Sequence, residues 1–170
     1  MTTTSRPVPP MNDDERATLA GWLDFYRATL AQKCDGLHDA PLRTASVAPS
    51  ELTLLGLLQH MAEVERNWFR RVLIGEDIGP VYVDENASEG HDGGFTLTDD
   101  SSYRGAIGAW DAEVVRAREN CASRELQDTS TFRGGEVSLR WIYLHMIAEY
   151  ARHCGHADLI RERIDGATGV

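Results

Sequence analysis

The sequence has no long hydrophobic run, which removes membrane-spanning proteins from consideration. None of its apolar stretches approaches the ~20 residues that a transmembrane helix needs. Residues 1–10 also lack the apolar segment of a signal peptide. We therefore expect a cytoplasmic protein.

Basic residues are scarce. Lys and Arg number 17 against 27 Asp and Glu, and the formal net charge is −10. Nucleic acids and anionic membrane surfaces attract proteins through clustered Lys and Arg, so we expect neither as a partner. The acidity is interpreted as a contribution to solubility, and a small molecule is the expected partner.

Cysteines are few and widely spaced, and no C-x-x-C motif is present. Cys34, Cys121 and Cys154 are odd in number, which fits reduced thiols better than a disulfide framework. Cys154 lies beside the candidate site described below and could be a reactive thiol. Free cysteines are more often small buried hydrophobes, and we interpret these three in that way.

Apolar residues recur at helical spacing in four parts of the chain. They predict helices over about Asp13–Cys34, from a cap at Ser50 or Thr53 to Val72, from Ser101 or Ser102 through Val114, and from Leu139 towards Ile164. No strong strand pattern is present, and "RGGEVS" (residues 133–138) is expected to be a break. The pattern predicts an all-α fold, a four-helix bundle, formed by one domain over residues 11–170 after a disordered arm, residues 1–10.

Each predicted helix carries one tryptophan, and aromatic residues at helical spacing usually belong to the core. We therefore expect all four in the interior: Trp22, Trp68, Trp110 and Trp141. The Gly-rich, acidic residues 75–100 are predicted to form a long loop, which could let the second and third helices run in the same direction.

One face of the last predicted helix carries four ionisable residues within roughly 80° of one another: His145, Glu149, His153 and His156. Ile142 and Leu159 share this face and should point into the bundle. Ionisable groups on a core-facing stripe are costly unless they are paired or bind a metal. His145 and His156 are separated by roughly 16 Å of helical rise, so the four cannot share one ion.

Neighbours on a helix are three or four residues apart, which leaves three candidate ligand pairs: His145–Glu149, Glu149–His153 and His153–His156. His60 lies on the stripe of Leu57 and Val64 and should face the core as well. If the second and last helices are antiparallel, the depth of His60 matches the C-terminal half of the last helix.

The first choice of metal ligands is therefore His60, Glu149 and His153, with His156 as an alternate ligand or a residue that supports one. Gly56, one turn before His60, would leave room beside the ion. Two imidazoles and a carboxylate suit a divalent ion, with Zn²⁺ the first choice and Ni²⁺, Co²⁺ or Fe²⁺ as alternatives. Three protein ligands leave open positions, as in catalytic sites.

Two competing metal motifs are absent from the sequence. Without H-E-x-x-H, a zincin-type protease is disfavoured, and without E-x-x-H, so is a ferritin-like di-iron bundle. His38 and His91 fall in predicted loops and are expected to be solvated.

Two segments, "LTLLGLLQHMAEVERNWF" (52–69) and "SLRWIYLHMIAEYARHCGHADLIRERIDG" (138–166), resemble the DinB-like superfamily, especially its mini-circle protein branch. The resemblance covers roughly residues 13–166. It implies a four-helix bundle with parallel second and third helices and a metal held by three side chains. Relatives use a histidine of the second helix, here His60, and two ligands four apart on the last helix, here Glu149 and His153. The His/Glu/His set is similar to that of mycothiol-dependent maleylpyruvate isomerase.

Some members of this superfamily are transferases or isomerases that use mycothiol or bacillithiol. The resemblance therefore implies a metal-dependent thiol S-transferase, in which a thiol sulfur or a water at the open position attacks an electrophilic substrate. His156 would assist proton transfer as a catalytic residue, and Arg152 would bind an anionic group of the cofactor. The isomerase has an additional C-terminal domain that this chain does not match, so only the metal-binding bundle is carried over.

Two alternatives of other classes stay open. The first is a non-catalytic bundle that binds a metal or small ligand in a stress-related or regulatory role. The second is a buried polar network around His60 without a metal. A homodimer is also expected as an option, because small helical proteins often dimerise.

Overall fold

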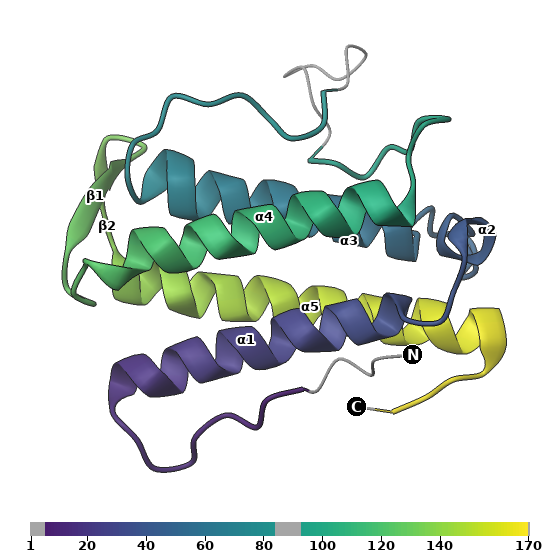
Figure 1. The fold of residues 1–170 in the computed structure, drawn as a ribbon, viewed down its shortest axis with the longest axis horizontal. Coiled ribbons are helices and arrows are strands. Elements are labelled where there is room, and N and C mark those ends of the chain that lie inside the picture. Colours follow the sequence, from purple (N-terminus) through teal and green to yellow (C-terminus); the bar gives the residue numbers. More distant parts are fainter. Residues whose placement is uncertain (1–5, 84–92, 170) are drawn as a thin grey trace.

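The computed structural model describes residues 6–83 and 93–169 of the chain. Four long helices lie side by side in it (Figure 1): α1 (Glu15–Cys34), α3 (Leu54–Arg66), α4 (Tyr103–Ala122) and α5 (Leu139–Asp165). The predicted helical segments are thus confirmed. The second predicted helix reaches Val72 as expected, but its last part, η1 (Asn67–Val72), is π-helical. A single turn, α2 (Asp39–Leu42), before α3 was not predicted.

Each long helix begins at a side chain that accepts a hydrogen bond from a backbone N–H of its first turn, which satisfies a donor that the helix itself leaves open. These capping residues are Asp14, Thr53, Ser102 and Ser138. Of the alternatives that the sequence left open, Thr53 and Ser102 are therefore the caps.

The directions of the helices decide which residues can meet. In Figure 1, α3 and α4 both run from the end of the molecule where α2 lies towards the opposite end, while α1 and α5 run the other way. Since α3 and α5 are antiparallel, His60 in the middle of α3 faces the middle of α5, where Glu149 and His153 lie.

A small hairpin joins α4 to α5, so the helical pattern breaks there as expected, but the two strands within the break were not predicted. Strands β1 (Thr129–Phe132) and β2 (Gly135–Ser138) pair antiparallel, with Phe132 opposite Gly135. Arg133 and Gly134 between them have φ angles of 49° and 79°, the combination that a tight two-residue hairpin turn requires. The strands are only four residues long, too short for a clear alternation in the sequence.

The interior contains two of the four tryptophans, so the prediction for this set was half wrong. Trp68 and Trp110 are buried, whereas Trp22 is 41% and Trp141 45% exposed. Leu159, expected to point into the bundle, is 56% exposed. Each helix buries only the part of its circumference that meets its neighbours, and helical spacing alone does not mark the edge of that part.

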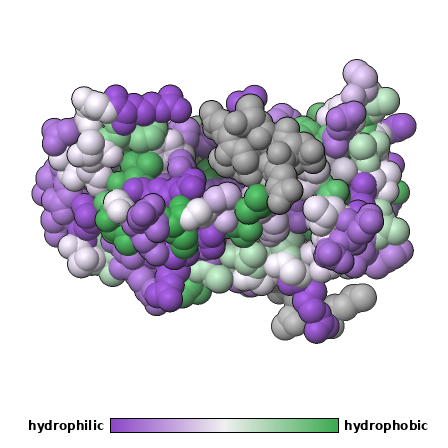
Figure 2. Space-filling view, turned by 90° about the horizontal axis from the view of Figure 1, so that it is seen from above, coloured by the Kyte–Doolittle hydropathy of each residue, from purple (hydrophilic) through white to green (hydrophobic). Residues whose placement is uncertain are grey.

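The three cysteines are free and buried, as predicted. In the described parts of the 75–100 segment, residues 75–83 and 93–100, there is no helix or strand, and both parts pass along the outside of α3 and α4 (Figure 1). On the face shown in Figure 2, hydrophobic residues occur in small groups between hydrophilic ones. Among the described residues, no helix is both long and apolar enough to cross a membrane.

Candidate metal centre

Three side chains from two helices meet at the centre of the α3–α5 contact. His60 of α3 and Glu149 and His153 of α5 each offer a ligand atom, and these atoms all lie within 4.8 Å of one another. Glu149 Oε2 is 3.4 Å from His153 Nε2, and the rings of His60 and His153 meet edge to face with centroids 4.7 Å apart. The structure thus brings together the three residues that the sequence selected.

The ring of His60 is oriented by the loop after α3. Its Nδ1 lies 2.8 Å from the carbonyl oxygen of Gly93. A carbonyl oxygen only accepts, so Nδ1 carries the proton and, in the neutral ring, the lone pair of the imidazole is on Nε2. Phe95 stacks on the same ring with centroids 4.0 Å apart and an angle of 19° between the planes. Such contacts fix both the tautomer and the orientation of a metal-binding histidine.

Close contact between this loop and α3 depends on glycines. Gly94 has a φ of 86°, and a Cβ there would lie 3.1 Å from the backbone carbon and oxygen of Gln59. On α3, a Cβ at Gly56 would lie 3.0 Å from the carbonyl oxygen of Phe95. The room left by Gly56 is therefore taken by the loop and not by an ion, which corrects the expectation for this residue.

His153 is buried and has an unusual acidity. Burial and, to a smaller extent, the nearby charges of His60, His156 and Arg152 together lower its pKa to about 4. The ring is therefore neutral at pH 7 and has a lone pair to give. Its Nδ1 lies 3.3 Å from His156 Nδ1, so His153 Nδ1–H can donate a hydrogen bond to His156. The lone pair of His153 is then on Nε2, the atom that faces Glu149.

Glu149 lies between two histidines, but His145 has a different environment from His153. His145 Nε2 is 3.9 Å from Glu149 Oε1. Its ring stacks on Trp141 with centroids 4.9 Å apart and lies 4.4 Å from Trp68. Burial lowers the pKa of His145, and Glu149 partly opposes this. His145 is not part of the three-residue cluster, so the His145–Glu149 pair among the alternatives gains no third ligand within the described residues.

The other described histidines and Arg152, which the sequence also singled out, are not part of the three-residue cluster. His156 is partly buried against His153, and Arg152 is exposed and acts on His153 through its charge. His38 is exposed before α2, as expected, while His91 is outside the described residues. Sequence reasoning missed Gly93 and Phe95. The sequence "HDGG" (residues 91–94) is typical of a tight turn, but nothing in it indicates that residues 93–95 pack against His60.

The donor set suits a divalent ion. Two ligand atoms of a tetrahedral Zn²⁺, each about 2.1 Å from the metal, are separated by about 3.4 Å. The Glu149–His153 pair already has this spacing, and the ligand atom of His60 lies within 4.8 Å of both. Two neutral imidazoles and one carboxylate leave a divalent ion with one uncompensated positive charge and with open coordination positions.

The comparisons with known proteins give one match. The family model described as Mycothiol-S-transferase matches residues 18–166, which includes all three residues of the cluster. No curated protein matches the chain, and no solved structure does.

Proposed function

Because this chain belongs to the mycothiol S-transferase family, a DinB-like family, we propose that it is a metal-dependent S-transferase that joins mycothiol, or a similar low-molecular-weight thiol, to an electrophilic small molecule. The observation that carries the proposal is the cluster of His60, Glu149 and His153 at the centre of the α3–α5 contact. Zn²⁺ is the first choice of metal, and the helical arrangement is assigned to the DinB-type four-helix bundle with α3 and α4 as its parallel pair.

The charge of the site supports a thiolate as the reacting group. A bound divalent metal lowers the pKa of a thiol and so supplies a sulfur nucleophile at neutral pH. With Glu149 as the one anionic ligand, the site keeps a net positive charge that a thiolate would neutralise. In the reaction the S–H proton is lost, a carbon–sulfur bond forms at the electrophile, and the leaving group departs with the electron pair of the broken bond.

The residues around the ligands have separate tasks in this proposal. The Gly93 carbonyl and Phe95 hold His60, and His156 holds His153. His156, at 3.3 Å from His153, is also the nearest candidate to receive the thiol proton. Arg152 is exposed on the same helix and would meet an anionic group of the thiol or substrate.

The experiment combines metal content with turnover. Untagged protein loaded with Zn²⁺ is assayed by fluorescence for thioether formation between mycothiol and monochlorobimane, with glutathione as the comparison thiol. We expect about one metal per chain and a rate with mycothiol well above the uncatalysed rate. In His60→Ala and Glu149→Gln, metal and acceleration should both be lost, by 100-fold or more in rate. His38→Ala, the same type of change at an exposed histidine, should behave as wild type.

Two other results would decide against the proposal. Stoichiometric metal in wild type without acceleration by any thiol would favour the non-catalytic metal-binding bundle. Folded wild-type protein that takes up no metal after replenishment would leave a buried polar network around His60.

A further inference from the structure

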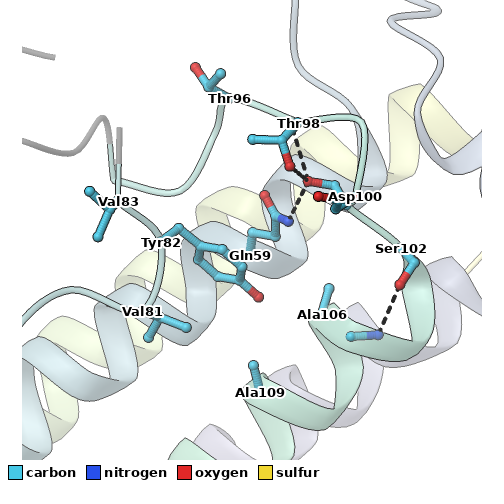
Figure 3. A pocket seen from close by; sticks show the side chains of 12 residues that line it. Gln59, Val81, Tyr82, Val83, Thr96, Thr98, Asp100, Ser102, Ala106 and Ala109 are labelled. Carbon is cyan, nitrogen blue, oxygen red and sulfur yellow. Dashed lines mark hydrogen bonds between the residues drawn. The ribbon is translucent and has the colours of Figure 1, made fainter. Parts of the chain in front are cut away.

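A second site lies beside α3, away from the three proposed ligands. A cavity of about 550 Å³ is formed by α3, the start of α4 and the loop segments 81–83 and 96–102 (Figure 3). None of His60, Glu149 and His153 lines it. Its volume is in the range of pockets that bind small molecules.

Two buried polar atoms in this cavity lack a hydrogen-bond partner among the described residues: the side-chain oxygen Oε1 of Gln59 and the hydroxyl oxygen of Tyr82. Figure 3 shows both groups in the space between the loop and α4. Gln59 is 2% exposed, so its amide has almost no contact with bulk solvent. A buried polar atom without a partner is destabilising, so two in one cavity require an explanation.

The orientation of the Gln59 amide does not remove the problem. As placed, Nε2 donates to Ser101 Oγ at 3.2 Å and Oε1 is left over. Rotating the amide by 180° would let Ser101 donate to the oxygen but would leave the NH₂ group without a partner. In both orientations one atom of the Gln59 amide lacks a hydrogen-bond partner. A ligand hydroxyl could bind either atom, because a hydroxyl both donates and accepts hydrogen bonds.

The residues that line the cavity favour a ligand without negative charge. None of the described residues that line the cavity is Lys, Arg or His, and the one charged residue is Asp100. Further polar groups are hydroxyls, among them Thr96 and Thr98, while Val81, Val83, Ala106 and Ala109 form apolar walls. Burial raises the pKa of Tyr82 to about 12, so its hydroxyl is neutral at physiological pH. An anion would meet no compensating charge here.

We propose that this cavity binds a neutral, hydroxyl-bearing small molecule with an apolar body, held by hydrogen bonds to Gln59 and Tyr82. The site goes beyond the proposed transferase function, because it requires neither the metal nor the thiol. Gln59 and His60 are consecutive in α3 and leave it about 100° apart, with residues 93–95 packed over the helix at this point.

The test uses two probes of the same shape and different charge, phenyl β-D-glucoside and phenyl β-D-glucuronide, titrated into metal-free protein. The readout is the change in amide resonances. We expect saturable shifts at Thr98, Ser101 and Gly105 with the glucoside and at least tenfold weaker binding of the glucuronide. Gln59→Leu and Tyr82→Phe should each weaken the glucoside at least tenfold, while Gln127→Leu, at an exposed glutamine, should not.

Stability provides the second arm of the test. Because Gln59→Leu replaces a partly unsatisfied buried amide by an apolar group of similar length, the melting temperature should stay the same or rise. Absent shifts at the cavity, equal binding of both probes, or a lower melting temperature of Gln59→Leu would each overturn the proposal. None of these results affects metal uptake or thiol transfer, so this proposal and the proposed function can fail separately.

Discussion

Arg27 and Glu65 form a buried bidentate ion pair, with Nε 2.8 Å from Oε1 and Nη2 2.7 Å from Oε2. Glu65 is completely buried and also accepts a hydrogen bond from the Tyr150 hydroxyl at 2.7 Å, which in turn accepts one from Trp110 Nε1 at 2.7 Å. The four residues come from α1, α3, α5 and α4, so one chain of polar contacts joins all four long helices. Each side-chain nitrogen of Arg27 and Trp110 has an acceptor, whereas Oε1 of Gln59 has no partner among the described residues.

Removing one partner of this ion pair should be strongly destabilising. Glu65→Leu leaves the Arg27 guanidinium buried without its carboxylate, and we expect a loss of about 3–5 kcal/mol in the free energy of unfolding, measured by urea denaturation. Combining it with Arg27→Met removes both charges and should recover most of the loss. Glu119→Ala at the exposed pair Arg116–Glu119 should cost less than about 1 kcal/mol. Equal losses at both pairs would show that the buried network does not hold the helices together.

His156 should tune metal affinity without being a ligand. It lies against Nδ1 of His153, and loss of such a supporting contact typically weakens metal binding by about 10–100-fold. His156→Ala should show this loss in a Zn²⁺ titration with unchanged helix content by circular dichroism. His156→Asn places an acceptor near the same position and should restore part of the affinity. His38→Ala, at the exposed histidine before α2, is the control for metal binding. Unchanged affinity in His156→Ala would remove the supporting role.

The buried thiols should be unreactive in the folded protein. Burial raises the pKa of Cys34 and of Cys154 to about 12, so very little thiolate is present at pH 8. We expect alkylation by iodoacetamide to be at least 100-fold slower in native protein than in urea, followed by mass spectrometry. Thiol transfer should persist in Cys154→Ser. Rapid native labelling of Cys154 would instead make it a candidate nucleophile.

Gly94 should be required for the loop to pack over α3. An alanine there would have a φ of 86° and a Cβ 3.1 Å from the Gln59 backbone, so Gly94→Ala should destabilise the protein by about 1–2 kcal/mol or displace the loop. Displacement would release Phe95 and the Gly93 carbonyl from His60 and weaken Zn²⁺ binding. Gly108→Ala, in an open part of α4, should stabilise by about 0.5–1 kcal/mol. Both changes are read from thermal denaturation, and a neutral Gly94→Ala would contradict the role of this contact.

Periodicity in the sequence was sufficient to find the helices, because burial of an apolar stripe is a local property that repeats along the chain. The capping residues and the burial of the cysteines could also be predicted, because they follow from residue type and local position. The two candidate ligands on α5 could be selected because residues four apart on a helix are neighbours whatever surrounds them. His60 could be added on the condition that two helices are antiparallel, as the structure has them.

Other features depend on the tertiary structure and have no periodic pattern in the sequence. Whether a tryptophan is inside depends on where neighbouring helices end their contact, and so Trp22 and Trp141 are exposed despite their helical spacing. The hairpin at residues 129–138 depends on a two-residue turn with positive φ.

The surroundings of the candidate metal site could not be predicted from the sequence either. Gly93 and Phe95 reach His60 from 33 and 35 positions along the chain, and the cavity at Gln59 and Tyr82 forms between segments that are distant in sequence. Local composition determined the helices and which residues could be ligands. Packing between distant segments, which has no periodic trace in the sequence, determined how the candidate ligands are held and where the cavity proposed for a second ligand forms.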